Sequence, residues 1–264
     1  MVDCAPISPI QTDDRLWNLA ANSCVAIPTP ILFTRFIEQP CPEGAFFLLP
    51  QEISEDDFIT VSRSIGIDQD KLSIAMGFAR TVHSEQPRND GLRNHYTGHA
   101  LLVPLYYAMI EINAGRAVEE DVFLAGVMHD IKEDGPLFND DYLTAVFGAE
   151  VVDHLHTISK PPKSNYRHLQ PPDLDLERES DYLAQFDGKG MGIKSLKCAD
   201  KVANLRDDWA NAGTSSKSLA YMREAQKLFL PFAETMIMHR REYAMYLRYM
   251  IEMLAYKHSM DFLS

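Results

Sequence analysis

The chain has 264 residues, of which 46% are hydrophobic and 24% are charged, so it can bury a sizeable core as one domain or as one domain with an extension. Its formal net charge of −13 argues against non-specific binding to nucleic acid or to an anionic membrane. The sequence lacks both the roughly 18 uncharged apolar residues that a membrane helix needs and a secretory leader, so we expect a cytoplasmic protein.

Residues 1–66 are predicted to form an irregular N-terminal extension of unknown role. Seven of the 15 prolines fall within residues 1–50, and the apolar residues there show no sustained period. Residues 45–50 (AFFLLP) are interpreted as packing against the main domain, which we place at residues 67–264.

Beyond the extension, the apolar residues recur at the three- and four-residue spacing that is typical of amphipathic helices. This pattern covers residues 72–82, 99–111, 139–158 and, on both sides of an expected break at Pro231, residues 219–254. We therefore predict an all-α fold. The C-terminal stripes are interpreted as core or as dimer surface, which makes a homo-oligomer one expectation.

The run MHDIKEDG at residues 128–135 carries four polar side chains at helical offsets of zero, one, four and five, which places them on one helix face. These side chains are His129, Asp130, Glu133 and Asp134. The preceding residues 121–128 are apolar enough to form a core helix, and a polar group left unpaired beside it would cost about 1–3 kcal/mol. A bound divalent metal ion accounts for the cluster, and a solvated helix end is the alternative.

Further candidate ligands occur in two distant segments. His99 lies upstream in HYTGHALLV, and Asp200 lies downstream in SLKCADKVANLRDD. Three separate segments therefore each supply a group that can bind a metal ion.

The segment 159–180 contains two proline pairs, which exclude a continuous helix. Its first half carries Lys160, Lys163, Arg167 and His168, ahead of an acidic second half. It is either a solvated loop or a mobile lid whose cations contact substrate phosphates, and only the geometry decides between them.

Four segments together resemble a known family. In chain order they read ARTVHSEQPRNDGLRNHYTGHALLV, FLAGVMHDIKEDG, FGAEVVDHLHTISK and SLKCADKVANLRD, and they span roughly residues 70–235. They resemble the HD-superfamily hydrolase domain of RelA/SpoT proteins and of the small alarmone hydrolases, which include metazoan SpoT homologues. The motifs HDxxED and ADKxxNLR are the most specific parts of the match. The resemblance implies an all-α HD-domain helical bundle.

The resemblance also implies an activity, the removal of the 3′-pyrophosphate from ppGpp or pppGpp, usually with Mn2+, which yields GDP or GTP and pyrophosphate. By matching position, the metal ligands would be His99, His129, Asp130 and Asp200. Two neutral imidazoles and two carboxylates suit Mn2+ or a similar divalent ion. Glu133 and Asp134 would flank the attacking water as the acid–base groups, and either of them can be the base.

For the substrate, the resemblance implies three contacts. Arg88 would hold a phosphate, and Tyr96 matches the aromatic residue before the metal-binding histidine. Asn204 shares a helix face with Asp200, so it can reach a substrate near the metal.

The chain departs from the family pattern at two positions. Asn89 stands in place of the usual lysine, and Ala100 stands in place of the usual proline. Because the lysine is missing, the preference for guanine or adenine is left open. His83 and His95 are interpreted as structural histidines, and lining the site entrance is their alternative role.

The predicted function is that of a metal-dependent alarmone hydrolase with a small nucleotide substrate. One alternative is an HD phosphohydrolase that acts on another nucleotide, such as ppApp, the 2′-phosphate of NADPH or a deoxynucleotide monophosphate. A second alternative is a non-catalytic nucleotide sensor. The chain ends about 60 residues after the last motif, which leaves no room for a synthetase domain, so we expect only the degrading activity.

Overall fold

The structure, a computed structural model, describes residues 49–88, 93–135, 138–168, 170, 173–211 and 216–261. The predictions that concern Asn89 and residues 1–48 lie outside these residues. Within the described part, an isolated antiparallel bridge between Pro87 and Asn94 is the only β-type pairing, and the remaining regular structure is helical. The predicted all-α class is therefore confirmed. No described helix has both the length and the hydrophobicity that are needed to cross a membrane.

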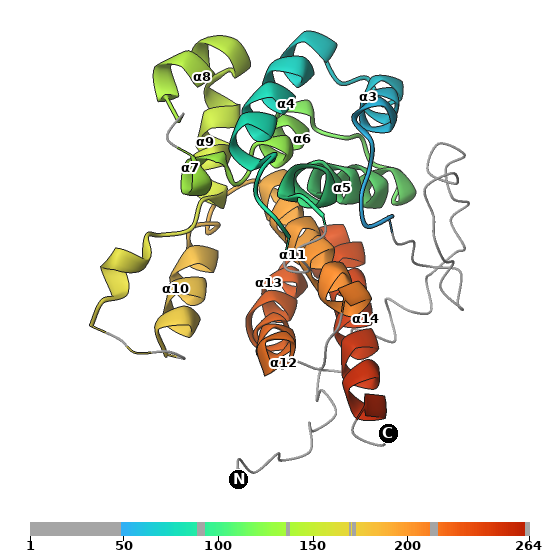
Figure 1. Cartoon of the computed structure of the whole chain (residues 1–264), viewed down its shortest axis with the longest axis vertical. Coiled ribbons are helices and arrows are strands. Elements are labelled where there is room, and N and C mark those ends of the chain that lie inside the picture. The colour runs from blue at the N-terminus through green and yellow to red at the C-terminus, as the bar shows by residue number, and fades with distance from the viewer. Residues whose placement is uncertain are drawn as a thin grey trace.

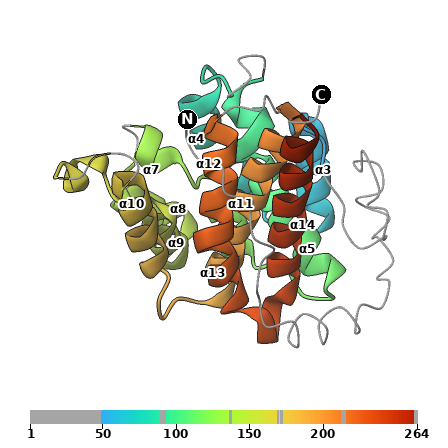
Figure 2. The same ribbon diagram turned by 90° about the horizontal axis from the view of Figure 1, so that it is seen from below.

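The helices form two groups that meet at α11 (Figure 1). Helix α11 contacts α5, α6 and α9 of the first group and α12, α13 and α14 of the second, which lie side by side in Figure 2. In chain order the helices are α3 (Glu55–Ser64), α4 (Gln69–His83), the π-helix η1 (Tyr96–Ala100), α5 (Leu102–Asn113), α6 (Glu120–Val127), α7 (Ile131–Asp134), α8 (Asp140–Phe147), α9 (Ala149–Ile158), the 3-10 helix η2 (Lys163–Tyr166), α10 (Asp173–Ala184), α11 (Met191–Asn211), α12 (Ser216–Glu224), the π-helix η3 (Ala225–Phe229), α13 (Leu230–Glu234) and α14 (Ile237–Asp261).

Helix α5 lies in the core because it is apolar on all of its faces. Every residue from Leu102 to Glu111 is buried, and α5 packs against α6 and α11. A helix that is hydrophobic all round is stable in water only when other elements cover it. Its position inside the bundle therefore follows from its composition.

Glu111 is the one acidic residue in this buried helix, and cations and a hydroxyl surround it. Its carboxylate accepts hydrogen bonds from Arg116 Nε at 2.8 Å and from the Tyr243 hydroxyl at 2.7 Å. Arg240 Nη1 lies 2.9 Å from Glu111 Oε2, at a point where the backbone of α14 is locally non-helical. These contacts tie α14 to α5.

Replacing Glu111 by alanine is expected to destabilise the protein by about 3 kcal/mol, because it leaves the partly buried charges of Arg116 and Arg240 without their shared partner. The control is Glu242→Ala, since Glu242 also pairs with Arg116 but its side chain is 24% exposed. The control should cost less than about 1 kcal/mol. Urea denaturation of the two variants measures both values, and equal costs would contradict the central role of Glu111.

Helix α3 lies within the predicted N-terminal extension and packs on the bundle. Ser54 caps the helix, since its Oγ accepts a hydrogen bond from the Asp57 amide at 3.1 Å. Phe58 and Val61 are buried in the core. The described part of the extension, residues 49–66, therefore contributes to the core, and a domain boundary at residue 66 stays a prediction.

The helices predicted within residues 139–158 are present as α8 and α9. Asn139 caps α8 by accepting a hydrogen bond from the Tyr142 amide at 2.9 Å, and Gly148 ends it with φ of 93°. The expected break near Pro231 is a change of helix type, from the π-helix η3 to α13, rather than an open loop. Pro231 falls in the first turn of α13, where a missing amide hydrogen is tolerated.

The segment 159–180 is only partly a loop. Its basic half contains η2, and its acidic half forms residues 173–180 of α10. The Tyr166 hydroxyl donates to Asp181 Oδ2 at 2.9 Å, so α10 folds back onto the basic half.

Candidate metal centre

The HD pair lies in a turn rather than in a helix. Helix α6 ends at Val127, and α7 begins at Ile131, so His129 and Asp130 occupy the turn between them. The four polar groups of this region therefore do not share one continuous helix face, contrary to the expectation from their spacing. The turn directs His129 into the core, where it is buried, while Asp130 stays partly exposed.

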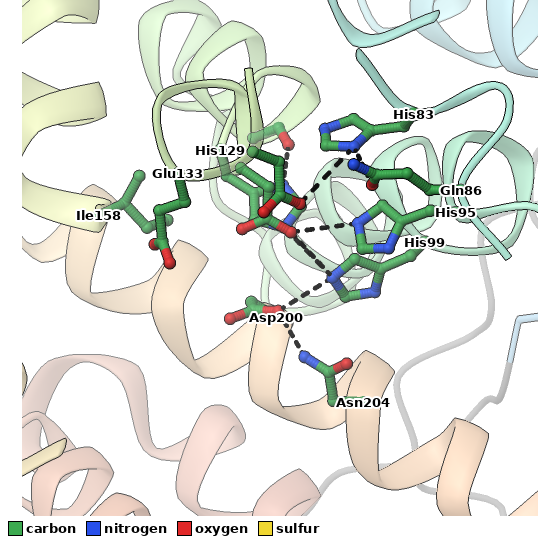
Figure 3. A network of polar contacts seen from close by, with 12 residues as sticks. His83, Gln86, His95, His99, His129, Glu133, Ile158, Asp200 and Asn204 are labelled. Atoms are coloured by element: carbon green, nitrogen blue, oxygen red, sulfur yellow. Dashed lines mark hydrogen bonds and ion pairs between the residues drawn. The ribbon is translucent and has the colours of Figure 1, made fainter. Parts of the chain in front are cut away.

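Three separate parts of the chain bring the predicted ligands together (Figure 3). His99 comes from η1 and Asp200 from α11, and His129 and Asp130 come from the turn. His129 Nε2 lies 3.0 Å from Asp130 Oδ2 and 3.2 Å from His99 Nε2, and His99 Nε2 lies 3.3 Å from Asp200 Oδ1. The ligand atoms of His99, His129 and Asp200 all lie within 4.8 Å of one another.

The imidazoles of His99 and His129 differ in their pKa values. Burial lowers the pKa of His99 well below its usual value, so this ring is neutral. Burial also lowers the pKa of His129, but the adjacent Asp130 carboxylate more than reverses this effect and raises it to about 9. His129 Nδ1 donates to the Gly126 carbonyl at 2.8 Å, which leaves Nε2 to face the carboxylates.

The two carboxylates remain ionised although Asp200 is buried and Asp130 is only partly exposed. Burial raises the pKa of Asp130, but the neighbouring His129 brings it well below the usual range. Burial likewise raises the pKa of Asp200, and Lys197 reverses the shift, with its Nζ donating to Asp200 Oδ2 at 2.6 Å. Asn204 Nδ2 donates to Asp200 Oδ1 at 2.7 Å. Both oxygens of Asp200 are thus oriented by other side chains.

This donor set fits a divalent cation. Two imidazole Nε2 atoms face each other at 3.2 Å beside two carboxylates, and an ion between such groups satisfies all of them at once. Neighbouring ligand atoms lie 3.0–3.3 Å apart, which is about the edge length of an octahedron with ligand distances of about 2.2 Å. The His/Asp cluster can therefore hold a metal ion.

Because a proton occupies His129 below about pH 9 in the metal-free protein, a metal ion must displace it. Binding of Mn2+ is therefore expected to tighten about tenfold for each pH unit between pH 7 and 8 and to release about one proton. Calorimetric titrations in two buffers with different ionisation enthalpies measure this proton. Binding that is independent of pH would contradict the expectation.

The predicted acid–base residues Glu133 and Asp134 lie in α7, and their surroundings differ. Glu133 Oε1 accepts a hydrogen bond from the Lys160 amide at 2.7 Å, and Figure 3 shows Glu133 on the opposite side of the cluster from His95 and His99. Burial, followed by the charge of Asp130, raises the pKa of Glu133. The Asp134 side chain is 40% exposed, and its Oδ2 lies 3.9 Å from His83 Nδ1.

The three predicted substrate-binding residues lie in different surroundings. Arg88 is buried and donates to Asp207 and, at 3.2 Å, to Asn204 Oδ1. Asn204 links Arg88 to Asp200, so it lies directly beside the cluster. The ring of Tyr96 is buried, with the Arg80 guanidinium 5.7 Å from its centre. Substrate contacts by Arg88, Tyr96 and Asn204 stay predictions.

A cleft of about 840 Å³ opens beside Glu133 and Asp134. Lys132, Lys160 and Lys163 line it, together with Arg178. Lys160 and Lys163 belong to the basic half of the segment 159–180, so the structure places this half at the cleft.

No family model matches the chain, and no curated protein matches it. Among solved structures, the chain is similar to a metazoan ortholog of SpoT that is described as hydrolysing ppGpp and playing a role in starvation responses. The two share 20% sequence identity with a TM-score of 0.52, and the match covers 69% of this chain and 94% of the other. The chain has a SpoT-like HD fold. The predicted resemblance is therefore confirmed for the fold.

Within this SpoT-like HD fold, sequence reasoning missed two residues of the cluster. His95 was interpreted as structural, yet its Nε2 lies 3.1 Å from Asp130 Oδ2. The signal was present, because His95 and His99 are four residues apart and such pairs face the same side of a helix. Lys197 lies three residues before Asp200, and only its burial in the structure shows that it pairs with this carboxylate.

Proposed function

We propose that this protein is a divalent-metal-dependent hydrolase that removes the 3′-pyrophosphate from (p)ppGpp-type alarmones, giving GDP or GTP and pyrophosphate. One observation carries the proposal: two imidazoles and two carboxylates, of which only Asp130 is partly exposed, lie next to a cleft lined by cations in a SpoT-like HD fold. The proposal also names the metal ion, Mn2+, and assigns a role to each residue of the site.

The ion would be held by His99, His129, Asp130 and Asp200. Such an ion lowers the pKa of a nearby water and offsets negative charge that develops on the attacked phosphate. Lys197 and Asn204 orient Asp200, so they fix the position of this carboxylate before substrate binds.

Glu133 is proposed as the group that takes the proton of the attacking water. Its raised pKa makes it a better proton acceptor than an ordinary glutamate, and the Lys160 amide holds its orientation. The water oxygen adds to the phosphorus that is attached to the ribose 3′ oxygen. The bond between this phosphorus and the 3′ oxygen breaks, pyrophosphate leaves, and the 3′ oxygen takes up a proton. Asp134, which is more exposed, is proposed to assist in orienting the water.

The cleft supports the proposal that this acidic chain binds a polyanion. The chain as a whole carries a formal charge of −13, whereas three lysines and an arginine gather around the cleft. Glu133 and Asp134 share this lining and Glu179 pairs with Lys160, so the four cations leave a small excess of positive charge, which favours a nucleotide with several phosphate groups over one with a single phosphate. This favours a bis-pyrophosphate over a deoxynucleotide monophosphate as the substrate.

The proposal is tested with metal-stripped protein, incubated with and without Mn2+ in the presence of ppGpp, ppApp or NADPH, followed by separation of the products. We expect Mn2+-dependent release of pyrophosphate from ppGpp, and the comparison with ppApp identifies the preferred base. Release of orthophosphate from NADPH alone would move the function to another HD phosphohydrolase. Nucleotide binding without turnover would identify a sensor.

A further inference from the structure

We propose that His95 is a positioning residue for Asp130: its Nε2–H donates to Asp130 Oδ2, and Arg88 fixes this tautomer from the other side of the ring. The inference rests on the proposed function, because Asp130 is there a metal ligand. It assigns to His95 a role that differs from that of His99 and His129, although all three rings lie in one cluster.

The position of His95 brings it to the outer side of Asp130. His95 directly precedes the π-helix η1, and its ring centre lies 4.9 Å from that of His99 at an interplanar angle of 71°. Its Nε2 lies 3.1 Å from Asp130 Oδ2, the same oxygen that His129 Nε2 approaches at 3.0 Å. One carboxylate oxygen is therefore held between two imidazoles.

The contact with Arg88 decides which nitrogen of His95 carries the proton. A guanidinium has only hydrogen-bond donors, and Arg88 Nη1 lies 3.4 Å from His95 Nδ1, so Nδ1 is the acceptor. A neutral ring with an unprotonated Nδ1 carries its proton on Nε2. Since a carboxylate only accepts hydrogen bonds, the Nε2–H donates to Asp130.

The same reasoning gives the opposite result for His129. Its Nδ1 faces the Gly126 carbonyl, which only accepts, so Nδ1 keeps its proton, and Nε2 is the nitrogen that can bind an ion once it gives up its own proton. His129 is thus arranged as a ligand, and His95 is arranged as a donor to a ligand. The chemistry of the group behind each ring makes the distinction.

Arg88 can fix the tautomer because it is itself held firmly. The side chain is 7% exposed, and Arg88 Nε donates to Asp207 Oδ2 at 2.8 Å. Asp207 Oδ1 also accepts from Arg93 Nη1 at 2.9 Å. A continuous chain of contacts therefore runs from Asp207 through Arg88 and His95 to Asp130.

The expected consequence is a preorganised carboxylate. Groups that orient a metal ligand typically change metal affinity by about 10- to 100-fold when they are removed. We expect His95→Leu, which removes the donor and keeps a similar volume, to weaken Mn2+ binding by about 10- to 100-fold. We expect His95→Gln to restore affinity close to that of the wild type, because its amide N–H can reach Asp130 as Nε2–H does.

The matched control is His154→Leu. His154 is also 15% exposed, and its Nε2 lies 3.0 Å from Asp121 Oδ2, so it forms the same kind of pair outside the cluster. We expect this variant to bind Mn2+ as the wild type does. Free Mn2+ measured by electron paramagnetic resonance gives the affinities of the full-length proteins, and a thermal melt of each variant checks folding.

A second measurement is independent of any metal. In metal-free protein labelled with 15N in histidine, long-range proton–nitrogen spectra distinguish the two tautomers, and His95→Gln assigns the signal. We expect the proton of His95 on Nε2. A proton on Nδ1, or an equal loss of Mn2+ affinity in the Leu and Gln variants, would overturn the proposal and identify His95 as a ligand.

The failure of this inference is distinguishable from that of the proposed function. If the wild type binds Mn2+ and hydrolyses ppGpp while His95→Leu binds the ion equally well, the positioning role alone is overturned. If the wild type binds no Mn2+, the proposed function fails, and the role of His95 in metal binding fails with it.

Discussion

Asp130→Asn is expected to lower Mn2+-dependent turnover by about 1,000-fold or more, because loss of a metal ligand removes several kcal/mol of charge stabilisation in the transition state. Asparagine keeps the shape of the side chain but not its charge, and the two imidazoles that face Asp130 Oδ2 lose their anionic partner. Turnover of ppGpp and the affinity for Mn2+ should both decrease.

The matched control for this prediction is Asp121→Asn. Asp121 also accepts a hydrogen bond from a histidine, His154, and its side chain is 32% exposed against 26% for Asp130. The control should keep wild-type turnover. Full activity in Asp130→Asn would contradict a metal-dependent reaction at this cluster. If the wild type shows no turnover and Asp130→Asn still binds nucleotide, the protein is a sensor.

Glu133→Gln is expected to lower kcat by about 100- to 10,000-fold, because glutamine cannot take the proton of the attacking water. It still accepts the hydrogen bond from the Lys160 amide, so the local structure and the affinity for Mn2+ should stay close to wild type. Asp134→Asn is the natural comparison, and its more exposed side chain predicts a smaller loss. If Asp134→Asn loses more activity than Glu133→Gln, Asp134 is the base.

The pH dependence of the wild type provides a second check on Glu133. Burial and the charge of Asp130 raise the pKa of Glu133, so the carboxylate takes up a proton at a higher pH than an ordinary glutamate. A base must be unprotonated, so kcat should decrease as the pH falls through this raised pKa. Glu133→Gln should lose this acidic limb of the pH profile.

The four residues proposed as ligands come from distant parts of the chain that helix packing brings together. His99 lies in η1, which contacts α5, and Asp200 lies in α11, which packs against α5. Helix α11 also carries Lys197 and Asn204. The ion would therefore link the first group of helices to α11. A ligand that holds these parts together is expected to stabilise the folded protein, since it binds the folded chain and not the unfolded one.

The basic half of the segment 159–180 links helix α10 to Glu133. Lys160 contributes its backbone amide to Glu133, while its side chain pairs with Glu179 of α10. Arg178 of the same helix donates to the Pro161 carbonyl at 2.6 Å. Helix α10 thus holds the segment that orients Glu133, and neither alternative, a solvated loop or a lid, had included this helix.

The sequence by itself determined the fold class and the candidate ligand set. Apolar residues at three- and four-residue spacing require helices that bury one face, so the all-α class follows from local pattern. The run MHDIKEDG, together with His99 and Asp200 in distant segments, predicted a metal site, and the motifs HDxxED and ADKxxNLR assigned its ligands through the family resemblance.

Only the tertiary structure decided how the groups around these ligands act. His95 and Asp130 are 35 residues apart, and Arg88 and Asp207 are 119 residues apart, so no local pattern could pair them. The tautomer of His95 depends on which group lies behind its ring, and that is set by helix packing. The physical reason is that spacing along the chain determines which residues share a face, whereas burial and long-range contact determine their protonation and their partners.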